Sequence, residues 1–268
     1  MRCNLITNHG NQAGLERDAK LIRGFFEEKG WEVVDQQFNS PFMPPISDWN
    51  IFIETFVSQW CCRAKCNVLL VNPEWFHPSL NGPLRRYINS VWCKTPDAFR
   101  IFSGLVGAEK CQFIGFEASD LYLPGVVKQL KFLHVAGKSE AKNTAAVVQA
   151  WRMGIPFPLT VMTYHPVLQD MCQGVPNVRV LGWISDEQMA VEMNAHRFFI
   201  LPSLYEGYGH AIHEALGCKS VVLTTNAAPM NEFAGVDKRM VLPVKTAAPR
   251  FVTYFYGADP IGIKEAVE

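Results

Sequence analysis

Residues 3–38 read CNLITNHGNQAGLERDAKLIRGFFEEKGWEVVDQQF, and this opening stretch decides the fold. CNLIT is a short apolar run typical of a strand, and NHGNQAG is a polar turn that contains glycine. Apolar residues then recur at helical spacing, at positions 15, 19, 22, 25 and 26, until Gly30 ends the helix. WEVVDQQF is the next strand candidate. Strand, turn, helix and strand in this order predict the start of a parallel α/β sheet.

The same pattern starts again near residue 126. KFLHVAG (131–137) reads as a strand, GKSEAKN as a polar turn and TAAVVQAWRMG as a helix. Four further apolar runs read as strands: PLTVMTY, VRVLGW, FFILPS and SVVLTT. We therefore predict an α/β protein with two Rossmann-like units. The expected division is 1–125, 126–250 and a tail, 251–268, whose short helix packs back on the first unit.

Composition narrows the classes of protein that this chain can belong to. Apolar residues make up 49% of its 268 residues, and 25 basic residues balance 25 acidic ones. The apolar content excludes bulk disorder, and a zero net charge disfavours a protein held to nucleic acid mainly through phosphates. The chain has no apolar run of membrane-spanning length and no signal peptide in MRCNLITNHG. Its eight cysteines, three of them in CCRAKC, lack paired metal-ligand spacing. We expect a soluble, cytoplasmic protein with reduced cysteines.

A candidate ligand site follows the strand FFILPSL, where residues 205–217 read YEGYGHAIHEALG. The turn contains Gly207 and Gly209, which permit positive φ and a close approach of the backbone to a ligand. The amides that begin the next helix carry partial positive charge, so the turn suits an anion such as phosphate. In open parallel sheets, ligands bind beyond the carboxyl ends of the strands, where this turn is expected.

Helical spacing sorts the side chains that follow the turn. His210 and Glu214 are four residues apart and share one face, while Ile212, Ala215 and Leu216 share the other. A carboxylate at Glu214 can accept two hydrogen bonds, as from the hydroxyls of a ribose. The alternative interpretation is that Glu206 is a solvated loop acid and Glu214 a surface residue of the helix.

EGYGHAIHE (206–214), with two glutamates separated by seven residues, resembles the retaining GT-B glycosyltransferases of family 4. Three other segments occur in the order of that family: FLHVAGKSEAKNTAAVVQAW (132–151), VRVLGWIS (178–185) and SVVLTTNAAPMNEF (220–233). The resemblance covers about 130–235. It implies two Rossmann-like domains that face each other across a cleft, with a nucleotide-diphosphate-sugar as donor substrate.

The resemblance also implies a role for each matching residue. Glu214 would hold the ribose, Glu206 the donor sugar, and Lys142 the departing diphosphate, with His210 beside the phosphates or the acceptor. The remaining donor contacts would come from the turn glycines with Tyr208, from the loop that begins at Gly137 with Lys138, and from Trp183 and Ile184 beside the base. The family often has arginine near the position of Lys138, so this residue departs from the pattern. We interpret His213 as a helix-surface histidine with satisfied hydrogen bonds.

The first half of the chain matches the family only in topology. NHGNQAG (8–14) stands where the family has a glycine-rich loop facing the donor sugar, which makes His9 and Gly10 candidates. PEWFHP (73–78) contains Trp75 and Phe76, which either stack on an acceptor or pack in the core. His77, in the same segment, is interpreted as a packed loop histidine.

The reaction implied by the resemblance is transfer of a sugar to a hydroxyl with retained anomeric configuration. The family needs neither metal nor cofactor, and the chain has no Asp-x-Asp sequence. We expect a glycan or glycolipid acceptor. Two alternatives remain open: a DNA glycosyltransferase of the virus type, which would act on hydroxymethylated bases in the host cytoplasm, and a nucleotide-binding module without catalysis.

Overall fold

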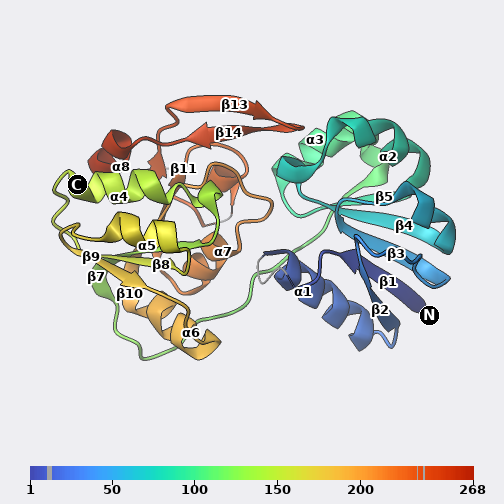
Figure 1. Ribbon diagram of the computed structural model, residues 1–268, viewed down its shortest axis with the longest axis horizontal. Coiled ribbons are helices and arrows are strands. Elements are labelled where there is room, and N and C mark those ends of the chain that lie inside the picture. Colours follow the sequence, from blue (N-terminus) through green and yellow to red (C-terminus); the bar gives the residue numbers. More distant parts are fainter. Residues whose placement is uncertain (11–13, 234, 238) are drawn as a thin grey trace. The chain divides into compact units, whose positions relative to one another are not determined.

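The computed structural model describes residues 1–10, 14–233, 235–237 and 239–268 (Figure 1). These residues form two units. The first comprises Met1–Phe116 and Pro249–Thr253, and the second Glu117–Ala248 and Tyr254–Glu268. The chain therefore divides at Phe116 instead of at the expected residue 125, and a short piece near the C-terminus belongs to the first unit.

The first unit is a parallel six-stranded sheet in the order β2-β1-β3-β4-β5-β6. Successive residues of a strand point to opposite faces. Thus Leu5 packs with the helix α1 on one face, and Ile6 packs with α2 and α3 on the other. The elements are β1 (Arg2–Thr7), α1 (Gly14–Glu28), β2 (Glu32–Gln37), β3 (Ser47–Glu54), β4 (Ala64–Val71), α2 (Asn81–Tyr87), β5 (Ser90–Cys93), α3 (Pro96–Val106) and β6 (Cys111–Phe113).

The second unit repeats the architecture, with strand order β12-β11-β10-β7-β8-β9 and all pairs parallel. Its strands are β7 (Gln129–Gly137), β8 (Leu159–Thr163), β9 (Val178–Leu181), β10 (His196–Leu201), β11 (Val221–Thr225) and β12 (Val241–Leu242). Its helices are α4 (Thr144–Arg152), α5 (Pro166–Cys172), α6 (Asp186–Ala195), α7 (His210–Gly217) and α8 (Pro260–Val267). The α/β class with two parallel sheets is as predicted.

Both faces of this second sheet are covered by helices. Phe132 and Ile200 pack with α4, α5 and α8, whereas the adjacent Leu133 and Phe199 pack with α6 and α7. Strands buried on both faces read as continuous apolar runs, which explains why FFIL and VVLTT are so apolar. The two faces give the unit two apolar cores.

The tail differs from its prediction. The short helix exists as α8, but it packs on α4 of the second unit, where Ile263 is fully buried. The segment that joins the first unit is instead Pro249–Thr253, the turn of a hairpin between β13 (Thr246–Arg250) and β14 (Thr253–Gly257). Ile263 and Val267 supply an apolar stripe that matches the outer side of the α4 core, and this match decides where the helix packs.

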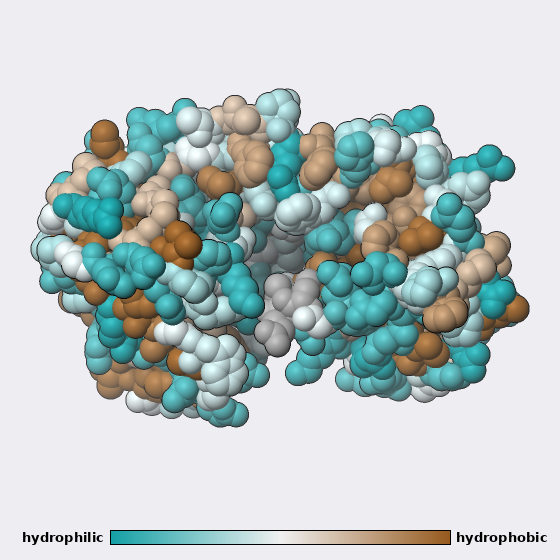
Figure 2. Space-filling view, in the orientation of Figure 1, coloured by the Kyte–Doolittle hydropathy of each residue, from teal (hydrophilic) through white to brown (hydrophobic). Residues whose placement is uncertain are grey.

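The surface of the molecule is mixed in polarity. On the face seen in Figure 2, hydrophobic residues lie in small patches separated by hydrophilic ones. Within the part of the chain that the structure describes, every helix falls short of the length and apolarity needed to cross a bilayer.

Candidate functional site

Two loops meet at the carboxyl edge of the second sheet. β7 and β10 are parallel neighbours that end at Gly137 and Leu201, so the loops that follow them leave the same edge. The N–H of Leu204 donates to the carbonyl of Ala141 at 2.8 Å. The N–H of Tyr256, on β14, donates to the carbonyl of Leu204, also at 2.8 Å. These backbone bonds fix the β10 loop against the loop that carries Lys142.

Lys142 and Glu206 form an ion pair across these loops. Lys142 Nζ lies 2.5 Å from Glu206 Oε1, and the two side chains are 21% and 11% exposed. The hydroxyl of Ser203 donates to the same oxygen at 2.6 Å. Ser203 stands in the quoted strand end FFILPSL, but sequence reasoning gave it no role. Its position, three residues before Glu206 and at the end of a buried strand, could have indicated that it belongs to the site.

The turn before α7 depends on glycine. Gly209 has φ +77°, and a Cβ placed there would lie 2.7 Å from Cε2 of Phe233, closer than real Cβ atoms come. Gly209 is also the residue that precedes α7, and within the described residues no side chain caps this helix. Helix α7 thus starts directly after the loop that contains Glu206, and the backbone amides of its first turn lie next to that loop. Such amides favour an anion.

The faces of α7 agree with the predicted spacing. Ile212 and Ala215 are fully buried in the core, and His210 is partly buried, its ring edge-on to Tyr208. Glu214 is only 4% exposed. The alternative interpretation of Glu214 as a surface residue is therefore wrong, because packing of α7 on the sheet encloses this carboxylate.

His213 is half-buried, and its ring is held by its neighbours. It stacks on Tyr208 with ring centroids 4.3 Å apart, contacts Phe233 at 4.5 Å, and its Nδ1 lies 3.2 Å from the carbonyl of Gly209. Burial lowers the pKa of His213, since the charged ring loses water. The three rings together hold the turn, so His213 contributes to the shape of the site.

His134 is a second residue that sequence reasoning missed. It lies fully buried on β7, with Nδ1 2.7 Å from the carbonyl of Ile200 and Nε2 2.9 Å from the hydroxyl of Thr144. A carbonyl only accepts, so Nδ1 carries the proton and Nε2 accepts from Thr144. Burial lowers the pKa of His134 to about 4. The neutral ring thus connects β7, β10 and the start of α4, two residues after Lys142.

The other predicted donor contacts lie around the same unit. Lys138 is exposed, with its Nζ 4.9 Å from the ring centre of Tyr164. Gly137 has φ +57°, and its carbonyl accepts from the hydroxyl of Thr163 at 2.6 Å. Trp183 is 78% exposed, whereas Ile184 packs against the core. An exposed indole is available to a planar ligand, and Lys138 is available to an anion.

In the first unit, His9 and Gly10 follow β1. His9 Nε2 lies 3.2 Å from the carbonyl of Leu5 and 3.6 Å from Oδ1 of Asp35, and Gly10 has φ +81°. The rest of the predicted glycine-rich loop, residues 11–13, lies outside the described residues. His9 is therefore engaged within its own unit.

The segment PEWFHP divides into core and surface. Phe76 is fully buried and packs on Phe102, whereas Trp75 is 48% exposed. The guanidinium of Arg250 lies 4.3 Å from the ring centre of Trp75, and its Nε donates to the carbonyl of Glu74 at 2.8 Å. His77 is exposed, so its interpretation as a packed residue is wrong, although its ring lies 5.6 Å from that of Phe251. Phe76 is thus a core residue, and the hairpin turn covers part of the segment.

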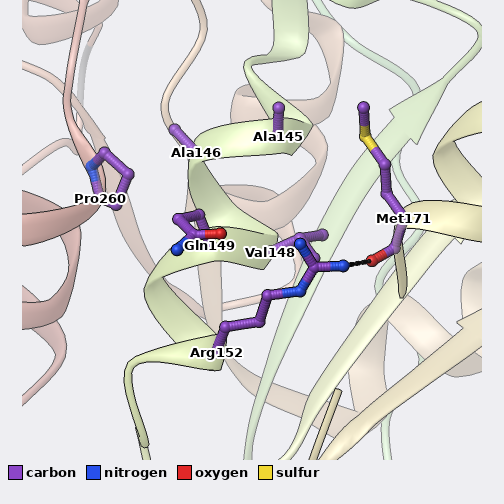
Figure 3. A pocket seen from close by; sticks show the side chains of 7 residues that line it. All are labelled: Ala145, Ala146, Val148, Gln149, Arg152, Met171 and Pro260. Atoms are coloured by element: carbon purple, nitrogen blue, oxygen red, sulfur yellow. Dashed lines mark hydrogen bonds between the residues drawn. The ribbon is translucent and has the colours of Figure 1, made fainter. Parts of the chain in front are cut away.

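A separate pocket of about 430 Å³ lies among α4, α5 and α8 (Figure 3). Ala145 and Gln149 line it from α4, Pro260 from α8, and Arg152 donates to the carbonyl of Met171 at 2.7 Å. None of the predicted site residues lines this pocket. Apart from the amide of Gln149, its walls are small or apolar side chains and a guanidinium that already donates to a carbonyl, so we assign no ligand to it.

Comparison with known sequences locates the family resemblance in the second unit. Residues 132–252 match the family model described as glycosyl transferases group 1. The O-antigen chain mannosyltransferase B of Escherichia coli is 27% identical over an alignment of 115 residues, and the match covers 38% of this chain and 30% of the mannosyltransferase. The chain thus spans under a third of that relative. The predicted resemblance is confirmed for the unit that contains Lys142 and Glu206.

Comparison with solved structures covers the whole chain. Sucrose-phosphate synthase from Thermosynechococcus elongatus has a TM-score of 0.70 at 13% identity, covering 100% of this chain and 88% of that one. HepE of Anabaena, in complex with UDP and glucose, has a TM-score of 0.66 at 14% identity, covering 100% and 89%. At such identities the likeness establishes the fold, which is that of the GT-B glycosyltransferases.

Proposed function

We propose that this chain, with its GT-B fold and a second unit of the group 1 glycosyl transferase type, transfers a sugar from a nucleotide-diphosphate-sugar to an acceptor hydroxyl. The observation that carries the proposal is the Lys142–Glu206 pair at the carboxyl edge of the second sheet, directly before α7. A cation, a carboxylate and a set of helix amides at one edge match the charges and hydroxyls of such a donor.

The diphosphate is proposed to lie between Lys142 and the first turn of α7. Negative charge develops on the diphosphate as it leaves, and preorganised donors stabilise that charge most where water is restricted. Lys142 supplies a full positive charge, and the amides after Gly209 supply partial charges. Lys138, which is exposed on the same loop, adds a second cation.

The sugar and the nucleoside are proposed to lie on either side of the diphosphate. Glu206 binds hydroxyls of the sugar, and Glu214 binds the ribose. The exposed Trp183 lies against the base, next to Ile184. The HepE structure contains UDP and glucose, and this supports a nucleoside diphosphate donor for the same fold.

We propose a hydroxyl of a glycan or glycolipid as the acceptor. Two similar proteins support this class by their names, an O-antigen chain mannosyltransferase and a lipopolysaccharide outer core galactosyltransferase. The anomeric configuration is proposed to be retained: the acceptor attacks on the face that the diphosphate leaves, and a phosphate oxygen takes the proton of the hydroxyl. Lys142 neutralises the diphosphate in this scheme, so activity should persist in EDTA.

The test is release of nucleoside diphosphate from a panel of UDP-glucose, UDP-galactose and GDP-mannose, with and without glycan acceptors. Lys142→Ala and Glu206→Ala are each expected to lower turnover about a hundredfold or more, the size of losing one charge-stabilising group. Lys245→Ala, an exposed lysine of the same unit, is the matched control and should turn over normally.

Two outcomes would contradict the proposal. Near-normal turnover in both site variants would remove the assignment of the site. Binding of nucleotide by the wild-type protein without release from any donor would favour a nucleotide-binding module that lacks catalysis.

A further inference from the structure

Two donors of different kinds converge on one oxygen of Glu206. Ser203 Oγ lies 2.6 Å from Oε1, and Lys142 Nζ lies 2.5 Å from the same atom. Hydrogen bonds to an ionised carboxylate are stronger than neutral ones. The orientation of Glu206 therefore depends on two contacts, one with a neutral hydroxyl and one with a cation.

Ser203 is the fixed contact of the two. It is 1% exposed, its N–H donates to the carbonyl of Leu201 at 2.9 Å, and its own carbonyl accepts from the hydroxyl of Thr225 at 2.7 Å. The residue is thus fastened on both sides at the end of β10. Its hydroxyl reaches Glu206 from a rigid backbone.

Lys142 is the contact that can change. Its side chain is 21% exposed and stands at the end of a three-residue turn, Glu140–Lys142. Four flexible methylenes carry its ammonium group, which is a point charge without a preferred plane. A diphosphate carries more negative charge than one carboxylate, so it competes with Glu206 for this ammonium.

We propose that Ser203 is the positioning residue of Glu206, and that its hydroxyl holds the carboxylate in place when a donor diphosphate takes Lys142 over. The inference rests on the proposed function, because it requires a diphosphate beside Lys142. In the free protein the Lys142–Glu206 pair keeps both groups ordered. In the donor complex Lys142 turns to phosphate, and Ser203 alone keeps Glu206 pointed at the sugar.

The first experiment separates the role of Ser203 from a loss of stability. Ser203→Ala is compared with Ser220→Ala, another buried serine of the same unit, whose hydroxyl bonds the carbonyl of His196 and the ammonium of Lys128. We expect Ser203→Ala to lower kcat about tenfold to a hundredfold, the worth of a hydrogen bond to a charged group. Its affinity for UDP or GDP alone, measured by calorimetry, should stay within about twofold of wild type. Ser203→Thr, which keeps the hydroxyl, should recover most of kcat.

The second experiment tests the exchange of Lys142 between partners. Glu206→Gln removes the competing charge but keeps the shape of the side chain. The variant should bind UDP or GDP about twofold to fivefold more tightly than wild type, the worth of a partly exposed ion pair, while losing turnover. Tightening should fade as salt concentration rises.

The outcomes are separable from those of the proposed function. If wild type turns over a donor and Ser203→Ala keeps the kcat of Ser220→Ala, the role of Ser203 is wrong while the transferase stands. Unchanged or weaker diphosphate binding in Glu206→Gln would overturn the exchange of Lys142. If wild type neither binds these nucleotides nor releases them from any donor, the proposed function falls and the role of Ser203 falls with it.

Discussion

A lysine–carboxylate pair with an N–O distance of 2.5 Å and little exposed side-chain surface occurs in each unit, and these two pairs differ mainly in their exposure to water. In the first unit Lys94 Nζ lies 2.5 Å from Asp18 Oδ2, and both side chains are 2% exposed. In the second unit the Lys142–Glu206 distance is also 2.5 Å, but the side chains are 21% and 11% exposed. The two pairs thus have the same N–O distance, but a ligand can reach only the pair in the second unit.

Burial explains what each pair can do. Helix α1 carries Asp18 on its buried face, and the ring of Phe116 lies 5.5 Å from the ammonium of Lys94. Charges sealed from water cannot exchange partners with a ligand, and removing one of them is costly because the other stays charged in a buried place. The open pair costs less to separate, because water or a phosphate can replace the lost partner. Breaking the first pair should therefore be costly for its unit, whereas the second pair can be separated at little cost.

The sharpest way to break this comparison is to remove one lysine from each pair. Lys94→Met leaves Asp18 charged and buried, so we expect it to lower the free energy of unfolding by about 3–5 kcal/mol. Lys142→Met leaves Glu206 partly exposed and still bonded to Ser203, so its loss should be about 1 kcal/mol or less. Urea unfolding followed by circular dichroism measures both values. Equal losses in the two variants would show that exposure does not separate the pairs.

Acid should separate the units in a second way, because the buried histidines His134 and His196 both lie in the second unit. Burial lowers the pKa of each from 6.5 to about 4. The unfolded chain takes up these protons near pH 6.5, but the folded unit does not. The contribution of the two neutral histidines to the stability of the unit is therefore present above pH 6.5 and lost as the pH falls toward 4. For each of the two histidines, the free energy of unfolding should fall by about 2 kcal/mol between pH 7 and pH 5.

Urea unfolding at pH 7 and pH 5 measures this effect. His134→Gln should flatten the pH dependence by the share of one histidine. His77→Gln, which changes an exposed histidine of the first unit, should leave the dependence as in wild type. A His134→Gln profile as steep as that of wild type would remove His134 as a source of the acid sensitivity.

The smallest expected effects come from one glycine in each unit. Gly209→Ala places a Cβ against Phe233 at positive φ, so it should cost about 1–2 kcal/mol and weaken diphosphate binding as the turn shifts. Gly24→Ala, inside α1 with open space around it, should instead stabilise by about 0.5–1 kcal/mol. Thermal unfolding and calorimetry with UDP or GDP measure the pair. A neutral Gly209→Ala would mean that the turn tolerates a side chain.

Much of the fold could be predicted because it is written in local patterns. The strand CNLIT became β1, the helix ending at Gly30 became α1, and the four apolar runs of the second half became β8 to β11. The very short β6 and β12 were not predicted, since two or three residues carry no periodicity. The tail helix was predicted as an element, but its packing on α4 was not, because an apolar face of a helix does not indicate which element it packs against.

The candidate site shows the same division at the level of single residues. Spacing along α7 was enough to place Ile212 and Ala215 in the core and His210 on the other face. Spacing did not reveal that Glu214 is enclosed or that His213 lies between two rings, because both depend on what packs over the helix. The sequence around Ser203 and His134 indicates no role for either residue, because their roles depend on hydrogen-bond partners that only the structure shows.

The sequence by itself determined the alternation of strands and helices, the two parallel sheets and the turn before α7, because periodicity and glycine act within a few residues. Only the tertiary structure decided that Lys142, 64 residues from Glu206, and Ser203 donate to one oxygen of Glu206. It alone also decided that Lys94 and Asp18, 76 residues apart, are sealed from water. The reason is that parallel sheets bring the ends of distant strands to one edge. Pairing and burial at that edge depend on neighbours that no local stretch of sequence contains.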